Sequence, residues 1–338
     1  MKKINLAING FGRIGRSALK VIIDYFPNIN IVAINDLADT EILSHLLRFD
    51  SAYGTYQHEV KFSKEAIIID KKKIPVFSAK DPSELPWQKL KVDIVLECTG
   101  KFRDREALSL HLKAGAKKVV LSAPAKGKGV KMIVLGVNEK KILKSDNLVS
   151  CASCTTNCLA PVTEVIRQKF GIKKALMTTI HAYTAGQNLV DGPSKDKRRA
   201  RAAALNIVPT TTGAAIATTE VIPSLKDNFD GMAVRVPTPV GSLCDVTYLL
   251  KKKTTSEMVN KVLSQVARGK LKGIIEVSKE EIVSSDIVGN SHSTIIDANS
   301  TKMIGGDMLK LISWYDNEWG YSNRLVELAV YLAKFIKK

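Results

Sequence analysis

The first half of the chain alternates short apolar runs with segments whose apolar residues recur at helical spacing. Ile4–Asn9 and Ile29–Asn35 predict strands, and Arg13–Tyr25 between them predicts a helix. Strands are also predicted at 93–99, 119–122 and 132–136, with smaller strands within 66–76. Because strands that alternate with helices form βαβ units, this half predicts a mostly parallel sheet.

The second half has a different pattern, and we place the boundary between the halves just before Cys154. A helix is expected from Cys154 to Phe170, ended by Gly171, and few helices separate the strands that follow. Strands are predicted at 175–182, 232–236, 245–250, 293–297 and 308–315, and helices at 213–222, 255–269 and 325–336. This arrangement favours an antiparallel or mixed sheet backed by helices.

The length and charge of the chain narrow the classes of protein. Its 338 residues suit two domains, and no apolar run reaches the roughly 18 residues that a membrane helix needs. Lysine and arginine number 51 against 33 acidic residues, a formal net charge of +18. The basic runs contain no aromatic residues and match no nucleic-acid-binding module, so nucleic acid is expected only in a secondary role. The positive field would still attract an anionic cofactor and substrate.

The N-terminus and the cysteines point to a cytoplasmic protein without disulfides or metal. The first apolar run stops at a glycine motif instead of continuing as a signal peptide. Five cysteines, an odd number, argue against a disulfide framework. Cys151, Cys154 and Cys158 approach metal-ligand spacing, but no second Cys/His group completes four ligands, so no metal site is predicted.

A glycine motif follows the first predicted strand and opens the first helix. Gly10, Gly12 and Gly15 form G-x-G-x-x-G, in which the glycines allow a tight turn, close approach of a pyrophosphate, and close helix–strand packing. The helix N-terminus offers free N–H groups to phosphates. Asp36 ends the second strand, where an acid can bind both ribose hydroxyls of NAD and repel the 2′-phosphate of NADP. The sequence therefore predicts an NAD site.

Cys154 stands at the start of the helix in the second half. A thiol at a helix N-terminus is expected to have a lowered pKa, and a thiolate is the form that attacks an aldehyde. His181 ends an apolar strand early in the same half and is the candidate to take the thiol proton. Cys158, one turn later, is expected to pack in the core, and Cys98 and Cys244 to be inert.

Three features of the second half suggest an anionic substrate. The segment 191–201 is rich in turns and basic residues, and 209–213 is a hydroxyl-rich helix start, which can bind anions. Arg235 is an isolated cation in an apolar run and needs an anionic partner. These pieces suggest a phosphorylated substrate; the alternative for the arginine-rich loop is a subunit contact or a solvated face.

Taken together, these residues resemble the glyceraldehyde-3-phosphate dehydrogenase family over essentially the whole chain. The resemblance rests on 9–16, 35–37, 152–161, 179–184, 209–215, 235–239 and 314–321, and the motif Ala-Ser-Cys-Thr-Thr-Asn-Cys-Leu-Ala-Pro around Cys154 is highly specific. It implies an NAD-dependent, phosphorylating oxidation of D-glyceraldehyde 3-phosphate to 1,3-bisphosphoglycerate in glycolysis and gluconeogenesis. The reaction would pass through a hemithioacetal and a thioester on Cys154, with His181 as acid and base.

The resemblance also assigns roles to further residues, domains and subunits. Matches to cofactor-contacting positions are Arg13, Ile14, Asp36, Lys80, Ser122 and Asn317. Matches to ligands of the substrate phosphate are Thr184 and Arg235, and matches to the site of the attacking phosphate are Ser153, Thr155, Arg201, Thr212 and Gly213. The implied architecture is α/β: an NAD-binding Rossmann domain over 1–153, completed by a C-terminal helix over 318–338, and an α+β catalytic domain over 154–317. A homotetramer is implied, in which the loop at about 183–205 reaches a neighbouring subunit.

Two departures from the family pattern leave alternatives open. After the Arg235 motif, many members have Asn-Val where this chain has Val240 and Gly241. After Thr184, the segment Ala185-Gly186-Gln187 lacks the aspartate that some bacterial members carry. Both concern fine substrate preference, and the degree of preference for NAD over NADP is also left open.

The nearest alternative is erythrose-4-phosphate dehydrogenase, which hydrolyses its thioester. The intact phosphate-site threonines and the Pro-Thr-Pro after Arg235 favour the phosphorylating activity.

Overall fold

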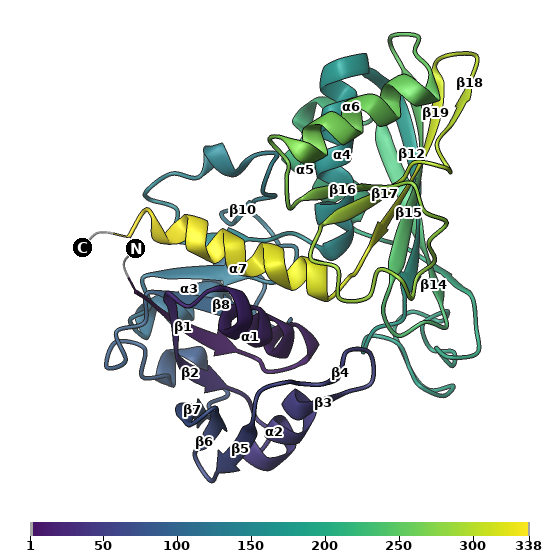
Figure 1. The fold of residues 1–338 in the computed structure, drawn as a ribbon. Coiled ribbons are helices and arrows are strands. Elements are labelled where there is room, and N and C mark those ends of the chain that lie inside the picture. Colours follow the sequence, from purple (N-terminus) through teal and green to yellow (C-terminus); the bar gives the residue numbers. More distant parts are fainter. Residues whose placement is uncertain (1–2, 337–338) are drawn as a thin grey trace. The chain divides into compact units, whose positions relative to one another are not determined.

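The computed structural model describes residues 3–336 and divides the chain into two compact units, each built on one large sheet (Figure 1). The first unit runs up to Ile133 and adds Lys140–Ala152 and the chain from Ser322 onward. The second unit contains Val134–Glu139 and Ser153–Tyr321. Residues 1–2 and 337–338, which belong to the predicted N-terminal domain and C-terminal helix, lie outside the described residues.

The first unit is built on a nine-stranded sheet with the order β10-β11-β9-β8-β1-β2-β7-β6-β5. All neighbours from β10 to β7 pair in parallel, and only the two pairs that β6 makes, with β7 and with β5, are antiparallel. The strands are β1 (Ile4–Asn9), β2 (Ile29–Asn35), β5 (Val60–Ser63), β6 (Ala66–Ile69), β7 (Lys72–Phe77), β8 (Ile94–Glu97), β9 (Lys118–Leu121), β10 (Lys131–Met132) and β11 (Leu148–Ser150). The predicted mostly parallel sheet is therefore confirmed.

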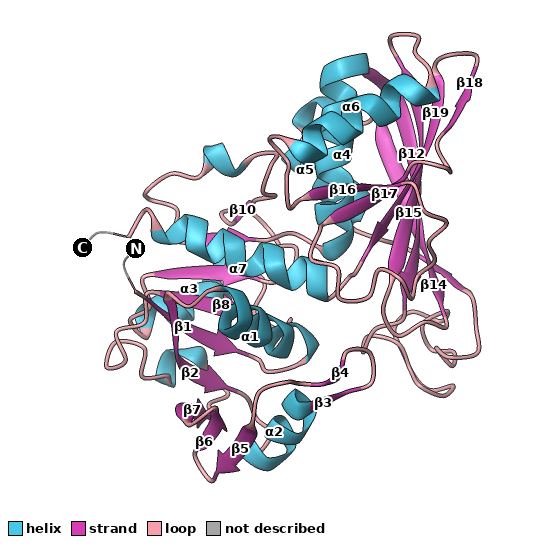
Figure 2. Ribbon diagram, in the orientation of Figure 1, coloured by secondary structure: helices cyan, strands magenta, loops and turns pink. Residues whose placement is uncertain are grey.

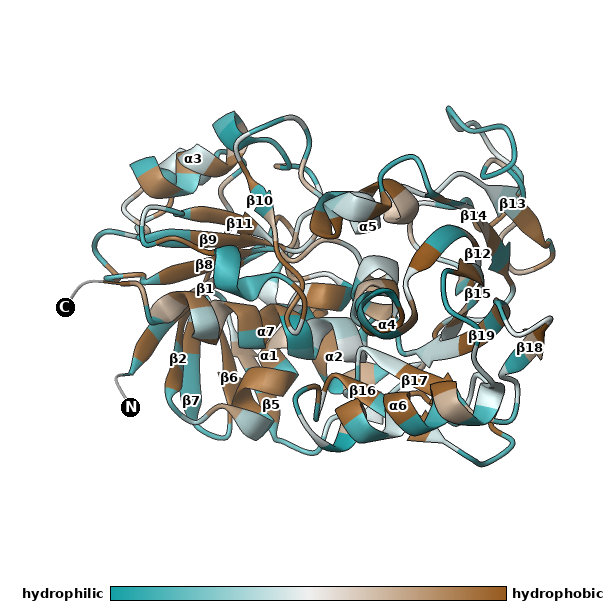
Figure 3. Cartoon of the chain, turned by 90° about the horizontal axis from the view of Figure 1, so that it is seen from above, coloured by the Kyte–Doolittle hydropathy of each residue, from teal (hydrophilic) through white to brown (hydrophobic). Residues whose placement is uncertain are grey.

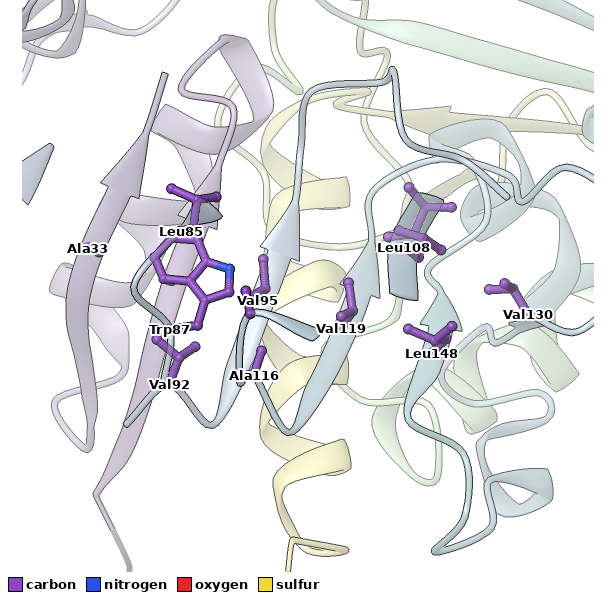
Figure 4. Packing of buried hydrophobic residues seen from close by; sticks show 13 residues of the cluster. Ala33, Leu85, Trp87, Val92, Val95, Leu108, Ala116, Val119, Val130 and Leu148 are labelled. Carbon is purple, nitrogen blue, oxygen red and sulfur yellow. The ribbon is translucent and has the colours of Figure 1, made fainter. Parts of the chain in front are cut away.

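Helices connect the strands of this unit. They are α1 (Arg13–Tyr25), α2 (Thr40–Arg48), α3 (Arg105–Lys113) and, from Ser322 onward, most of α7 (Trp319–Ala333). A small hairpin of β3 (Phe49–Asp50) and β4 (Gly54–Thr55) stands apart from the sheet. The central strands are apolar on both faces, as the hydropathy colouring shows for β8 and β9 (Figure 3). Trp87 packs beneath this sheet with Val95 and Ala116, and Leu108 of α3 belongs to the same buried cluster (Figure 4).

The second unit is built on a mixed eight-stranded sheet with the order β13-β14-β12-β15-β19-β17-β16, and β18 also pairs with β19. β12 pairs in parallel with β14 and antiparallel with β15, which confirms the predicted mixed sheet. The strands are β12 (Ile172–Ala182), β13 (Val208–Thr210), β14 (Phe229–Val236), β15 (Ser242–Leu250), β16 (Ile275–Ser278), β17 (Thr294–Asp297), β18 (Lys302–Ile304) and β19 (Met308–Tyr315).

Helices cover one face of this second sheet (Figure 2). They are α4 (Cys154–Phe170), α5 (Ala214–Val221) and α6 (Ser256–Arg268), and α4 contacts β12, β15, β17 and β19. The strands alternate accordingly: Ala175 and Met177 of β12 are buried, whereas Leu176 between them is 68% exposed. The helices therefore place the first turn of α4 against the centre of the sheet.

Candidate active site

The glycine motif forms one wall of a pocket at the carboxyl ends of β1, β2 and β8, with a volume of about 510 Å³. Gly10 has φ +90°, and a Cβ there would lie 2.6 Å from the backbone nitrogen of Thr99. A Cβ on Gly15 would lie 2.1 Å from the carbonyl oxygen of Gly10, so only glycine lets α1 pack this closely on the loop. Gly12 meets nothing within 4 Å, which leaves its backbone open to a ligand.

Asp36 borders the same pocket immediately after β2. Its carboxylate is fixed by two backbone N–H donors, from Phe11 at 2.7 Å and from Ala38 at 3.1 Å. The exposed Lys80 and the open Gly12 border this pocket too. An open glycine backbone, a helix N-terminus and an oriented carboxylate together fit a dinucleotide with a free ribose hydroxyl pair.

The other predicted cofactor residues lie near this pocket or in the second unit. Arg13, the first residue of α1, is paired with Asp50 at 2.6 Å, and Ile14 is half-buried beside it. Ser122 follows β9, and its N–H donates to the carbonyl of Glu97 at 2.9 Å. Asn317 belongs to the second unit and is buried there.

A strained turn places Cys154 at the first position of α4. Ala152, two residues earlier, is buried with φ +56°, a conformation that L-residues rarely adopt. Ser153 then caps the helix, because its hydroxyl accepts the N–H of Thr156 at 3.0 Å. This tight entry leaves Cys154 half-buried at the helix start.

The second unit brings Cys154 and His181 together, with 3.4 Å between Sγ and Nε2. His181 lies near the end of β12, whose register places it directly opposite Arg235 of β14. Arg235 Nη1 lies 2.7 Å from the imidazole Nδ1 and donates to the carbonyl of Ala182 at 2.8 Å. That carbonyl is also 2.7 Å from Nδ1. Since Arg235 and the carbonyl compete for Nδ1, the tautomer of His181 depends on where the guanidinium points.

Burial controls the electrostatics of this pair. Burial raises the pKa of the Cys154 thiol, although Arg235 and hydrogen bonds from Thr155 act to lower it. Burial, followed by the charge of Arg235, lowers the pKa of His181 to about 3. The sequence led us to expect a lowered thiol pKa from the helix start. In the structure the pKa of the Cys154 thiol is raised instead, because loss of water on burial has the larger effect. Each group alone is therefore held neutral.

Two residues that the sequence analysis missed support the pair. The Tyr315 hydroxyl bonds to the hydroxyls of Thr155 and Thr179 at 2.9 and 2.8 Å, and its ring meets the His181 ring edge-on. Ser242 accepts the N–H of Ala182 at 3.1 Å and donates to Asn317 at 2.9 Å. The sequence did contain a signal for each residue: Tyr315 lies in the 314–321 motif, and Ser242 directly follows Val240 and Gly241, where the chain departs from the family pattern.

That departure has a physical reason at Gly241. Its φ is +94°, and a Cβ would lie 2.5 Å from the carbonyl oxygen of Ser284. Its N–H donates to Asn317 at 3.1 Å. Gly241 thus allows the turn that fixes the carboxamide of Asn317, and Val240 beside it is buried.

The predicted phosphate ligands are only partly brought together. Ser153, Thr155 and Arg235 surround the Cys154–His181 pair. Thr184 is exposed two residues beyond β12, and Thr212 and Gly213 directly precede α5, where Thr212 accepts the N–H of Ala214. Arg201 is exposed and pairs with Asp191 at 2.7 Å.

The remaining cysteines differ in their surroundings. Cys158 and Cys244 are fully buried, as expected for core residues, and Cys158 contacts Thr294 at 3.6 Å. Cys98 is half-buried and borders the pocket of the first unit, where burial raises its thiol pKa. Within residues 3–336, no three His, Cys, Asp or Glu side chains gather as a metal site, and no helix is long and apolar enough to cross a membrane.

Comparisons with known proteins agree in both halves. Two family models match: the NAD binding domain of glyceraldehyde 3-phosphate dehydrogenase over residues 4–105, and the C-terminal domain of the same enzyme over residues 153–317. Glyceraldehyde-3-phosphate dehydrogenase of Thermotoga maritima is 52% identical over 330 residues, covering 97% of this chain and 99% of its own. The enzyme of Geobacillus stearothermophilus is 49% identical over 331 residues, covering 98% of each chain. Glyceraldehyde-3-phosphate dehydrogenase 1 of Bacillus subtilis is 49% identical over 332 residues, also covering 98% of each.

Proposed function

Because the chain belongs to the glyceraldehyde-3-phosphate dehydrogenase family of NAD-dependent oxidoreductases, we propose that Cys154 and His181 carry its reaction. The reaction is the oxidation of D-glyceraldehyde 3-phosphate to 1,3-bisphosphoglycerate, with NAD and inorganic phosphate as co-substrates, in glycolysis and gluconeogenesis. The observation that supports these roles is the 3.4 Å contact between the thiol and the imidazole. Nucleophile and base at hydrogen-bond distance are the arrangement that covalent catalysis needs.

The first step is proton transfer within the pair. Since burial opposes a charge on either group alone, the thiol and imidazole must charge together as thiolate and imidazolium. Nε2 can take the proton only when Nδ1 donates to the Ala182 carbonyl. Turning Arg235 from Nδ1 toward the substrate phosphate would favour this tautomer, so substrate binding and thiol activation support each other.

Oxidation and phosphorolysis follow on the sulfur. The thiolate attacks the aldehyde carbon, N–H groups at the start of α4 can stabilise the oxyanion that develops, and the His181 imidazolium returns its proton to that oxygen to give a hemithioacetal. NAD, when bound, would supply the hydride acceptor for the next step; His181, neutral again, takes the hydroxyl proton, and a thioester remains on Cys154. Phosphate then attacks the thioester carbon, and the sulfur leaves as thiolate. The hydroxyls of Ser153 and Thr155, with Thr212, Gly213 and Arg201, are proposed to hold that phosphate.

NAD is proposed to bind at the glycine pocket of the first unit. Its pyrophosphate would lie over Gly12 and the N-terminus of α1, and its adenine ribose against Asp36. Gly10 and Gly15 permit this loop, and Arg13, Ile14, Lys80, Ser122 and Asn317 remain the proposed contacts from the resemblance. The relatives described above are all named glyceraldehyde-3-phosphate dehydrogenases, which does not favour the erythrose-4-phosphate alternative.

We also propose a homotetramer. A hollow of about 690 Å³ is lined by three exposed apolar residues, Leu176 and Met308 of the sheet and Ile216 of α5, together with polar and charged side chains. Exposed apolar residues that gather around one hollow favour a protein contact there. Leu189 and Leu205, in the loop predicted to reach a neighbouring subunit, are more than three-quarters exposed. A cytoplasmic location and any nucleic-acid role stay predictions from the sequence.

A steady-state assay tests the proposed activity. Formation of NADH from D-glyceraldehyde 3-phosphate is followed with and without inorganic phosphate, and erythrose 4-phosphate is the comparison substrate. Turnover should require phosphate and should be faster with the three-carbon aldehyde. Phosphate-independent turnover with a preference for erythrose 4-phosphate would instead identify a hydrolysing enzyme.

A further inference from the structure

A row of buried polar side chains runs along the carboxyl edge of the nine-stranded sheet. It consists of Asn35 at the end of β2, Asn9 at the end of β1, Glu97 at the end of β8, His111 on α3, and Trp87; we call it the carboxyl-edge network. All five are at most 5% exposed, and Glu97, His111 and Trp87 are at 0%. Trp87 is anchored in the apolar cluster below the sheet (Figure 4).

The bonds of the network run in one continuous chain. Trp87 Nε1 donates to His111 Nδ1 at 3.0 Å, and His111 Nε2 lies 3.0 Å from Glu97 Oε2. Asn9 Nδ2 donates to the same carboxylate oxygen. Asn35 Nδ2 donates to Asn9 Oδ1 at 2.7 Å and to the carbonyl of Ala79 at 3.0 Å. The network therefore links the ends of three strands to the segment that follows β7.

The donor from Trp87 fixes the tautomer of His111. An indole N–H can only donate, so Nδ1 must carry a lone pair and the ring proton lies on Nε2. That proton points at Glu97, whose other oxygen receives the backbone N–H of Thr99 at 2.7 Å and the Thr99 hydroxyl. Glu97 thus accepts four donors, and each of its oxygens has a separate pair of partners.

Two members of the network, Asn9 and Asn35, border the proposed NAD site. They line the 510 Å³ pocket together with Thr99, the bonding partner of Glu97, whereas His111 and Trp87 are fully buried and do not border it. Thr99 also packs against Gly10, because a Cβ on that glycine would lie 2.6 Å from its nitrogen. A shift of the Glu97 carboxylate would therefore move two sides of the pocket: the turn at Gly10, through Thr99, and the side formed by Asn35, through Asn9.

We propose that His111 and Glu97 are positioning residues for NAD: they hold Asn9 and Thr99 in the orientation that the cofactor requires. The inference rests on the proposed cofactor site. Burying a carboxylate and an imidazole is costly, and an apolar core of the same volume is often at least as stable. A network in which every group is satisfied instead fixes one geometry. Since Asn9 and Thr99 line the pocket and both bond to Glu97, the geometry that the network fixes is that of the residues facing the ligand.

The test compares two substitutions at one position with a control on the same helix. His111→Ala removes the support of Glu97, whereas His111→Gln can return an N–H donor at the position of Nε2. Leu108→Ala is the control, because Leu108 is a fully buried residue of α3 in the Trp87 cluster but makes no bond to the network. All three are expected to lower the melting temperature. For each, the NAD dissociation constant, KM for NAD, kcat, and the rate of Cys154 alkylation by iodoacetamide are measured.

The expected result separates positioning from stability. His111→Ala should raise the dissociation constant and KM for NAD about 10-fold, with kcat at saturating NAD and the alkylation rate within about 2-fold of the parent. His111→Gln should recover most of the affinity, and Leu108→Ala should leave it within about 2-fold. An equal loss of NAD affinity in Leu108→Ala, or an unchanged affinity in His111→Ala, would overturn the proposal.

Two further measurements keep the result interpretable. If His111→Ala does not fold, the isosteric Glu97→Gln, which turns one acceptor into a donor, should show the same selective loss of NAD affinity, and normal affinity there would overturn the proposal. NAD binding is measured without turnover. A parent protein that binds NAD but does not oxidise the aldehyde would refute the proposed reaction while leaving the network test valid.

Discussion

At the scale of single residues, position along the elements predicted the two residues of the proposed reactive pair but not their electrostatics. Cys154 and His181 could be chosen from the sequence because one starts a helix and the other ends a strand. The contact between Arg235 and His181 could not be predicted, because it depends on the register of two strands 54 residues apart. The raised pKa of the Cys154 thiol could not be predicted from the sequence either, because it results from burial in the folded chain.

Replacing the nucleophile tests its role directly. Cys154→Ser should lower kcat for aldehyde oxidation by at least about 10³-fold, because a hydroxyl in this buried position is a far weaker nucleophile than a thiol. NAD affinity, measured by equilibrium titration, should stay within about 2-fold. Retained turnover would refute the assignment. Cys158→Ser, one turn further along α4, is the matched control, because it makes the same change of sulfur to oxygen but keeps the proposed nucleophile.

The base can be tested through the reactivity of the thiol. His181→Asn removes the proton acceptor at 3.4 Å, so kcat should fall about 10²- to 10⁴-fold. Alkylation of Cys154 by iodoacetamide at neutral pH should slow in the same variant. The rates are followed by loss of free thiol. An alkylation rate equal to that of the parent would remove His181 from thiol activation.

At the scale of elements, strong periodicity was predictable and short pairing was not. The order β1, α1, β2 was predicted with the bounds that the structure shows, because strand, glycine turn and amphipathic helix each leave a local signal. Helices α2 and α3 were missed, although Asp39 and Asp104 cap them through the N–H groups of Ile42 and Ala107. Short strands such as β11 and β13 exist only through their neighbours, so their residues carry little periodicity.

The junction of β2 with the glycine loop gives a prediction about cofactor choice. Asp36→Ala removes a carboxylate held by the N–H groups of Phe11 and Ala38, so hydrogen bonds to the ribose and repulsion of a 2′-phosphate should both be lost. The ratio of kcat/KM for NAD to that for NADP should fall about 10-fold or more. Steady-state kinetics with both cofactors measure it, and an unaltered ratio would argue against the ribose contact.

At the scale of the whole molecule, the net charge predicted an attraction for anionic ligands, but composition could not reveal the exposed surfaces. The net charge of +18 is spread over short lysine runs and shows no single patch in the sequence. The apolar face of the second sheet was hidden from the sequence because its residues alternate with buried ones along each strand. Only the fold shows which member of the alternation remains uncovered.

Self-association should depend on that face. Leu176→Asp places a charge on the exposed sheet surface and should weaken subunit association about 100-fold, because a buried unpaired charge is costly in an interface. Sedimentation over a concentration series measures this. Leu143→Asp, at an exposed leucine of the first unit, should leave the assembly unchanged. An undisturbed assembly in Leu176→Asp, at equal thermal stability, would place the subunit contact elsewhere.

The most direct measurement is to locate the acyl group during the reaction. The protein is mixed with D-glyceraldehyde 3-phosphate and NAD without phosphate, and the reaction is quenched in acid. The protein is then digested, and the masses of its peptides are measured by mass spectrometry. A 3-phosphoglyceroyl group should be found on the peptide that contains Cys154, and it should disappear when phosphate is added before the quench. An acyl group on another cysteine, or steady oxidation with no acylated peptide, would contradict the thioester mechanism.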